Sequence, residues 1–280
     1  MGKICILLST VIKNMFEIFN YDFMLRAFAA GIAISVIAPL VGTFLVVKKY
    51  SLIADTLSHV ALAGVAIGIL THTSPLLTTL IVTILASIAI EYIRTRKAVA
   101  ADAILAMFLP GGLALALVLL GFAKGINSNL FSYLFGSIST VSVFDLWLIG
   151  GLAVVTVGII FYFYSQLFYV SFDEESAKVS GINTEFINML LVILTSICIS
   201  LSMRIVGVLL VGALTVIPVT TAMQVARSFR ESMYLGVLFA CASVIVGLFL
   251  SFYLSLPAGG VIVLCSLFLF SSVSFLRLRQ

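Results

Sequence analysis

Long apolar segments separated by short polar ones run through the whole chain. Nine of these segments approach the ~20 residues that a helix needs to cross the hydrocarbon core of a bilayer. If one of them enters and leaves on the same side, the number of spans falls to eight. We therefore expect an all-α integral membrane protein, a polytopic bundle of eight or nine transmembrane helices. The predicted spans lie near residues 24–47, 52–71, 75–93, 102–122, 143–165, 183–203, 205–226, 232–254 and 258–276.

Two stretches are too polar to cross a membrane. Within residues 1–20, apolar and polar side chains alternate as in a helix lying at the membrane interface, so we expect a separate N-terminal interfacial segment there. Residues 123–142 fall between two predicted spans and should lie on the outer side. Residues 21–280 are expected to form a single transmembrane domain, with one polar cytoplasmic segment at about 171–182.

The composition agrees with this pattern. Hydrophobic residues make up 62% of the chain and charged residues 9%, and the mean hydropathy is +1.29. A soluble domain has ~25% charged residues. The 280 residues leave no room for a soluble catalytic domain beside the spans. The net charge of +4 fits basic residues at cytoplasmic helix ends and does not argue for nucleic acid as a partner.

The basic residues predict the orientation. If the loop at Lys48 and Lys49 is cytoplasmic, ten of the fifteen Lys and Arg fall on the cytoplasmic side. This excess satisfies the positive-inside rule with an odd number of spans. We therefore expect the N-terminus outside and the C-terminus in the cytoplasm.

One helix-length apolar run contains two polar side chains, Asp55 and His59, that are energetically costly to place in a membrane. Placing an Asp within a membrane costs ~2.5–3.5 kcal/mol on insertion scales. Residues four apart lie on the same helix face, so the two side chains should lie together. A carboxylate oxygen and an imidazole nitrogen suit a divalent cation such as zinc or manganese. The pair is our candidate metal site in a transport pathway.

Simpler interpretations of these residues stay open. Asp55 could cap the start of its helix while His59 bonds to a neighbouring helix. Ser58 could serve helix packing, or its hydroxyl could orient one of the two ligands. Two ligands from one protomer cannot complete a metal coordination shell, but a two-fold dimer could supply a second pair, with water filling the rest.

The polar cytoplasmic segment, VSFDEESAKVSGIN, spans residues 170–183. Ser171 or Asp173 could cap a short helix there, and Gly181 would end it. The acidic residues would then lie at the positive end of the helix dipole. The sequence predicts a short helix on the membrane surface, although a solvated loop without a partner is the alternative.

Four features in this order resemble the membrane permease subunit of bacterial ABC importers for zinc, manganese and iron. They are the Asp-xx-Ser-His span, the acidic segment ending in Ala-xxx-Gly, VGVLLVGALTVIPVTTA at 206–222 and SFYLSLPAGGVIVL at 251–264. The resemblance extends from about residue 24 to 276. It departs from the family at MFLPGGLALAL, residues 107–117, where the family tends to have a polar, serine-containing stretch.

The resemblance implies a mechanism and partners. Asp55 and His59 would line the metal route, and the acidic segment would be the coupling helix that docks on a cytoplasmic ABC ATPase. The implied assembly is a homodimer in the lipid of the bacterial inner membrane, with two ATPase subunits and an extracytoplasmic metal-binding protein. The metal is cargo, and no permanently bound cofactor is implied. The coupling residues carried over are Asp173, Glu174, Glu175, Ala177 and Gly181.

Two alternative functions stay open, one with a different energy source and one in a different class of protein. The chain has no GxxxxGK(S/T), no HExxH and no GxSxG, so we do not expect it to be an enzyme or to bind ATP through a P-loop. A proton-driven secondary metal transporter would need further buried acids for a proton relay. An intramembrane enzyme built on Asp55 and His59 would lack a nucleophile and a third ligand.

Overall fold

The computed structural model describes residues 21–96, 100–122, 133–137, 141–208 and 210–278. Every regular element among them is a helix, which confirms the predicted all-α class. The predicted N-terminal segment, residues 1–20, and most of 123–142 lie outside the described residues. The helices are α2 (Asp22–Val47), α3 (Leu52–Leu70), α4 (Pro75–Arg96), α5 (Ala101–Phe122), α7 (Val143–Tyr162), α8 (Tyr164–Phe172), α9 (Glu174–Val179), α10 (Thr184–Ser202), α11 (Val211–Val225), α12 (Phe229–Leu254) and α13 (Ala258–Leu278).

Eight of the described helices are long and apolar enough to cross a membrane. They correspond to eight of the nine predicted spans. The seventh predicted span, 205–226, forms α11, which has only 15 residues. The fifth ends early, at Tyr162, and the chain turns at Phe163 into the separate helix α8. The prediction of eight or nine spans is confirmed, and α11 is the element that made the number ambiguous.

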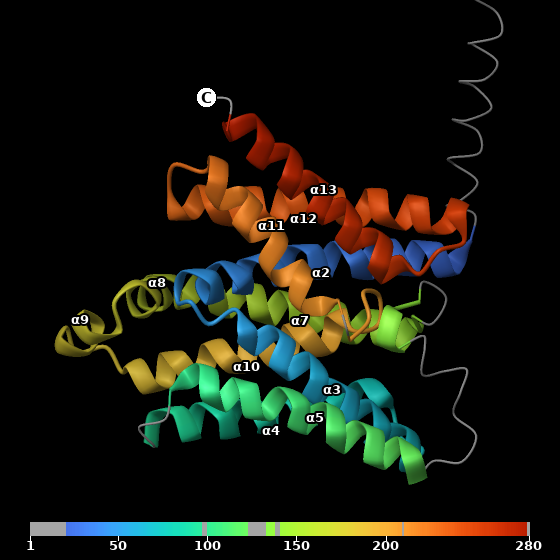
Figure 1. Cartoon of the computed structure of the whole chain (residues 1–280), viewed down its shortest axis with the longest axis horizontal. Coiled ribbons are helices and arrows are strands. Elements are labelled where there is room, and N and C mark those ends of the chain that lie inside the picture. The colour runs from blue at the N-terminus through green and yellow to red at the C-terminus, as the bar shows by residue number, and fades with distance from the viewer. Residues whose placement is uncertain (1–20, 97–99, 123–132, 138–140, 209, 279–280) are drawn as a thin grey trace, which may run out of the picture.

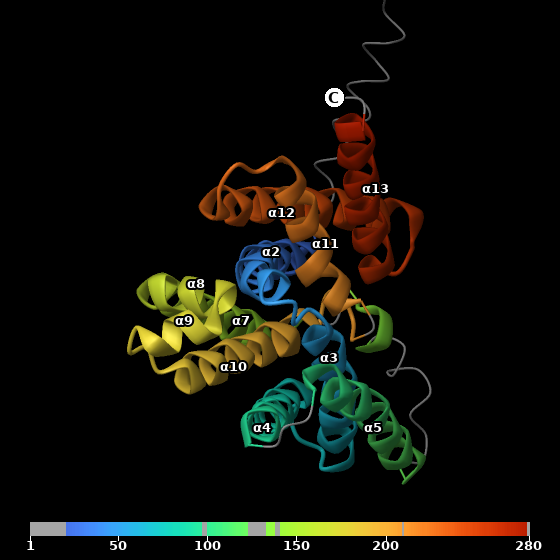
Figure 2. The same cartoon turned by 60° about the vertical axis from the view of Figure 1, so that its left-hand side comes forward.

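The long helices run side by side, and α9 projects from one end of the bundle (Figure 1). In both Figure 1 and Figure 2, α3, α4 and α5 form a group on one side, and α12 and α13 lie on the other, with α2 and α11 between them. The inner helices α2, α3 and α10 are largely buried, whereas α5, α7 and α13 leave most of their apolar surface uncovered. In a bilayer such surface can face lipid or another subunit.

Small residues allow α3 to lie very close to its neighbours. A Cβ added at Gly64 would lie 2.6 Å from the Cα of Thr79 in α4, and one at Gly68 would lie 2.7 Å from the Cα of Pro75. On the α5 side, a Cβ at Gly112 would lie 2.9 Å from the backbone N of Val60. Such small residues let helix backbones approach closely, and here they bring α3 against both α4 and α5.

The α3–α4 contact gives a stability test. We expect Gly64→Ala to destabilise the protein by about 1–3 kcal/mol, because its Cβ would meet backbone that cannot move aside easily. Thermal unfolding of the purified protein in detergent measures the effect as a lower Tm. Gly158→Ala in α7 is the matched control, because a Cβ there meets nothing within 4 Å. Equal Tm values for the two variants would contradict the close packing of α3 on α4.

Candidate functional site

Asp55 and His59 lie in the first two turns of α3. The Asp55 side chain is exposed in the single chain, whereas His59 is half-buried. The Nδ1 atom of His59 is buried, and no hydrogen-bond partner for it exists among the described residues. Because a buried polar atom without a partner is costly, this nitrogen is a candidate ligand atom.

Asp55 is not the cap of α3. The N-cap is Ser51, and Asp55 comes four residues later. Ser58 is buried, and its hydroxyl donates to the backbone carbonyl of Asp55 at 2.7 Å. That bond stays within the helix, so the carboxylate of Asp55 and the imidazole of His59 remain available to a ligand.

The carboxylate of Asp55 lies against the first turn of α11. A Cβ added at Gly212 would lie only 1.8 Å from Oδ1 of Asp55, so no larger residue fits there without displacing the carboxylate. The first N–H groups of a helix have no partner within that helix and form the positive end of its dipole. The carboxylate of Asp55 therefore lies beside the positive end of the α11 dipole.

An irregular turn at residues 203–208 sets where α11 begins. Gly207 has a φ of +84°, a left-handed conformation that favours glycine, and a Cβ there would lie 2.4 Å from the backbone N of Gly136. The backbone N–H of Val208 donates to the carbonyl of Tyr133 at 2.9 Å. The turn thus packs backbone to backbone against residues 133–137.

A buried ion pair lies beside this turn. Arg204 contacts Asp145 with an N–O distance of 3.3 Å, and its guanidinium carbon lies 5.5 Å from the centre of the Tyr133 ring. Asp145 also forms a capping box with Ser142 at the start of α7. Asp145 therefore complements the start of α7, and the side chain of its partner Arg204 is 11% exposed.

His72 lies apart from the pair. It follows the end of α3 in an exposed turn with a φ of +53°. The helical residues 60–70 separate it from His59, which corresponds to about 17 Å along the axis. Among the described residues, no group of three or more His, Cys, Asp or Glu side chains is arranged to hold a metal ion.

The acidic segment forms the short helix α9, as its sequence predicts. Asp173 is the N-cap, and its carboxylate accepts the backbone N–H of Ser176 at 3.0 Å. The hydrogen bonds from the Ser176 hydroxyl and N–H lower the pKa of Asp173. At the other end, Gly181 has a φ of +83°, and the N–H of Ile182 donates to the carbonyl of Ala177 at 3.1 Å. This pattern is a Schellman motif.

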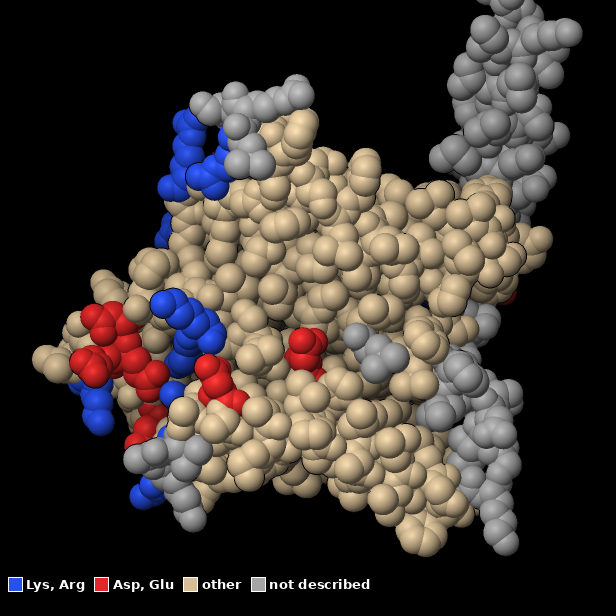
Figure 3. Space-filling view, viewed as in Figure 1, with Lys and Arg blue, Asp and Glu red and all other residues tan. Residues whose placement is uncertain are grey.

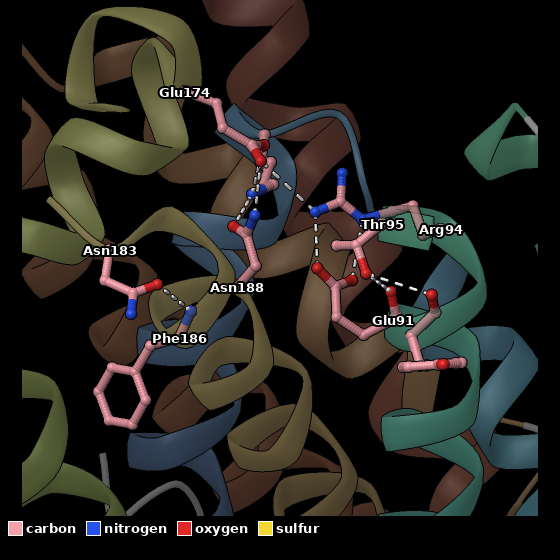
Figure 4. Close-up of polar contacts among 9 residues, drawn as sticks. Glu91, Arg94, Thr95, Glu174, Asn183, Phe186 and Asn188 are labelled. Carbon is pink, nitrogen blue, oxygen red and sulfur yellow. Dashed lines mark hydrogen bonds and ion pairs between the residues drawn. The ribbon is translucent and has the colours of Figure 1, made fainter. Parts of the chain in front are cut away.

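The side chains of α9 divide into two groups. Glu175, Lys178 and Val179 are exposed, and Val179 is 90% exposed. Ala177 is buried, and Glu174 points back toward the bundle, as Figure 4 shows. Figure 3 shows that Lys and Arg side chains gather at the same end of the molecule as α9.

Glu174 contacts three other parts of the bundle. It lies 3.2 Å from Nζ of Lys48 and 3.6 Å from Nη2 of Arg94, and it accepts a hydrogen bond of 2.7 Å from Asn188. Burial raises the pKa of Glu174, but Lys48, Arg94 and the hydrogen bonds from Lys48 and Asn188 outweigh it and hold this pKa below its ordinary value. The sequence grouped Glu174 with Glu175 by charge alone and gave no sign that their side chains face different ways.

Comparison with known proteins extends these observations. Residues 20–277 match the ABC 3 transport family. The chain is 32% identical over 259 residues to the high-affinity zinc uptake system membrane protein ZnuB of Haemophilus influenzae, covering 92% of this chain and 99% of that protein. It is 30% identical over 261 residues to the manganese import system permease protein ScaB of Streptococcus gordonii, covering 93% of this chain and 94% of that protein.

A solved structure is also similar to this chain over nearly its whole length. The structure of PsaBC from Streptococcus pneumoniae in complex with Fab is similar to this chain with a TM-score of 0.82 and 29% identity. The similarity covers 94% of this chain and 95% of the other. The family match spans nearly the whole chain, and the two relatives cover 92% and 93% of it. The chain therefore belongs to the ABC 3 transport family and is a metal-ion ABC transporter permease.

Proposed function

We propose that this permease forms the translocation pathway of an ATP-driven importer of zinc or manganese. The observation that carries the proposal is the Asp55–His59 pair on α3, with a buried imidazole nitrogen that has no partner among the described residues. Relatives described as zinc uptake and manganese import proteins support the choice of metals. Iron, which the sequence resemblance also allows, is the less favoured cargo.

The coordination chemistry favours a dimer. Asp55 supplies a hard oxygen and His59 a borderline nitrogen, so one chain offers two ligands of a shell that needs four to six. A second copy related by a two-fold axis would bring a second pair to the same pathway, with water completing the shell. Incomplete coordination by protein suits transport, because an ion must leave as readily as it enters.

The exposed side of α9 suits an ATPase. Glu175, Lys178 and Val179 project from the end of the molecule where the basic residues gather, which supports a cytoplasmic location for that end (Figure 3). In this proposal ATP is hydrolysed by two separate ABC subunits, and the permease itself is not an enzyme. The N-terminus then lies outside, where a binding protein would deliver the metal, and the C-terminus lies in the cytoplasm of a bacterial inner-membrane protein.

The structure gives little support to proton-driven transport. Among the described carboxylates, Glu91 and Asp145 are the buried ones. Each is paired with an arginine, Glu91 with Arg94 at 2.6 Å and Asp145 with Arg204 at 3.3 Å. Because each of these carboxylates is paired with an arginine, they do not form the chain of buried acids that a proton relay needs.

The metal route is tested by removing its ligands. We expect Asp55→Ala and His59→Ala each to lower uptake of radioactive zinc or manganese by at least about tenfold, because an ion in transit loses a ligand. Cells expressing the full transporter provide the assay, and copurification of the ATPase should be unchanged. Asp102→Ala is the control, since it removes an exposed carboxylate from the start of α5. Normal uptake in both ligand variants would exclude the pair from the route.

The contact between Asp55 and α11 gives a second test. We expect Gly212→Ala to reduce metal uptake severalfold without affecting ATPase copurification, because the new Cβ displaces the carboxylate. Gly260→Ala in α13 introduces the same methyl group where nothing lies within 4 Å. If the two variants transport equally well, the position of the Asp55 carboxylate does not matter for transport.

Docking of the ATPase is tested on the exposed side of α9. Glu175→Arg should weaken copurification of the ATPase with the tagged permease, because reversing a charge at a complementary interface is repulsive. Asp22→Arg makes the same change at the start of α2, an exposed site at the proposed outer end, and should leave copurification unchanged. The opposite result would place the ATPase, and hence the cytoplasm, at the other end of the bundle.

A further inference from the structure

A group of charged and polar side chains joins the inner side of α9 to three other parts of the bundle. Glu174 is its centre, and it contacts Lys48, Arg94 and Asn188. Figure 4 shows Glu174 with Arg94 and Asn188. Lys48 follows the last residue of α2, Arg94 lies in the last turn of α4, and Asn188 lies in the second turn of α10. Among the α9 side chains, Glu174 is the one with these contacts.

Arg94 is held rigidly on α4. Its guanidinium donates two hydrogen bonds to Glu91, at 2.9 Å and 2.6 Å, one turn earlier in the same helix. The Glu91 side chain is 1% exposed, whereas that of Glu174 is 39% exposed. A bidentate pair with a buried partner fixes the guanidinium plane, so Arg94 presents a preformed positive site to Glu174.

Lys48 connects Glu174 to the helix with the candidate metal ligands. It lies at the corner between α2 and α3, seven residues before Asp55. The corner is tight, since Lys49 has a φ of +57° and the N–H of Tyr50 donates to the carbonyl of Leu45 at 2.8 Å. A displacement of Lys48 is therefore passed to the start of α3 without being absorbed by a loose linker.

The second attachment leads to the same helix. Arg94 belongs to α4, which packs against α3 at Gly64 and Gly68 at nearly backbone-to-backbone distance. Such contact leaves little room for one helix to move without the other. Both attachments of Glu174, through Lys48 and through Arg94, thus converge on α3.

We infer that Glu174 is the positioning residue that transmits movement of α9 to α3, and with it to Asp55 and His59. The inference rests on the proposed function, in which the ATPase moves α9. Glu175 and the other exposed side chains of α9 contact the ATPase, whereas Glu174 connects the helix to the transport pathway. A pocket of about 270 Å³ lined by Lys48, Arg94 and Glu174, among others, lies beside these contacts, so Glu174 has space to move.

The test separates coupling from assembly and folding. Glu174→Gln keeps the size of the side chain and removes its charge. In vesicles reconstituted with the complete transporter, we expect this variant to retain ATPase copurification and ATP hydrolysis, while the metal imported per ATP hydrolysed falls at least fivefold. Glu185→Gln, an exposed acid at the start of α10, is the matched control and should keep the normal ratio. Loss of folded protein would lower uptake and hydrolysis together and leave the ratio unchanged.

A double-mutant cycle identifies the partner. Lys48→Gln should also lower the ratio of metal to ATP, and the double variant should be no worse than Glu174→Gln alone, because both substitutions break the same Glu174–Lys48 contact. If Glu174→Gln does not fold, the ratio of metal to ATP in Lys48→Gln tests the inference by itself. An unchanged ratio at undiminished ATP hydrolysis, additive effects or loss of ATPase binding in Glu174→Gln would overturn the inference. Failure of the unmodified protein to bind an ATPase or import metal would instead overturn the proposed function.

Discussion

The structure depends on one constraint: polar groups inside hydrocarbon must find partners within the protein. Many hydroxyls meet it locally, as when Thr43 and Thr195 donate to the carbonyls four residues earlier in their helices. Buried acids meet it with arginines, Glu91 with Arg94 and Asp145 with Arg204. Against this background, the buried Nδ1 of His59 is one of the few described side-chain atoms that lack a partner. A group left unpaired at such cost is a reasonable place to look for a passing ion.

The same constraint explains the form of α11. A helix that began at the membrane surface would present its free N–H groups to water and not to α3. Here the turn at 203–208 packs against residues 133–137, so irregular backbone is surrounded by protein. The helix start then meets the carboxylate of Asp55 at Gly212. Membrane transporters commonly direct interrupted helix ends at charged groups in this way.

The parts of this fold that local chemistry decides could be predicted from the sequence. Apolar runs must become helices in a membrane, and Asp173 and Gly181 mark the ends of α9 because capping depends on a few neighbouring residues. The irregular start of the 205–226 run could not be predicted, because the first part of that run is apolar and its turn depends on packing against Gly136, which is distant in the chain. For the candidate site, the sequence singled out Asp55 and His59, but their contact with α11 and the inward direction of Glu174 depend on packing between helices.

The difference in exposure between Glu91 and Glu174 bears on how a coupling contact can move. Separating two buried charges is costly, because each is left without water or a partner, so Glu91 and Arg94 should stay together. Glu174 is partly exposed, and water can solvate its carboxylate when it leaves Lys48 or Arg94, so its contacts can break and re-form at low cost. An apolar contact at the same place would expose hydrophobic surface each time it opened. The fixed ion pair of Glu91 and Arg94 on α4, beside the exchangeable contacts of Glu174 on α9, therefore suits a connection that moves once per transport cycle.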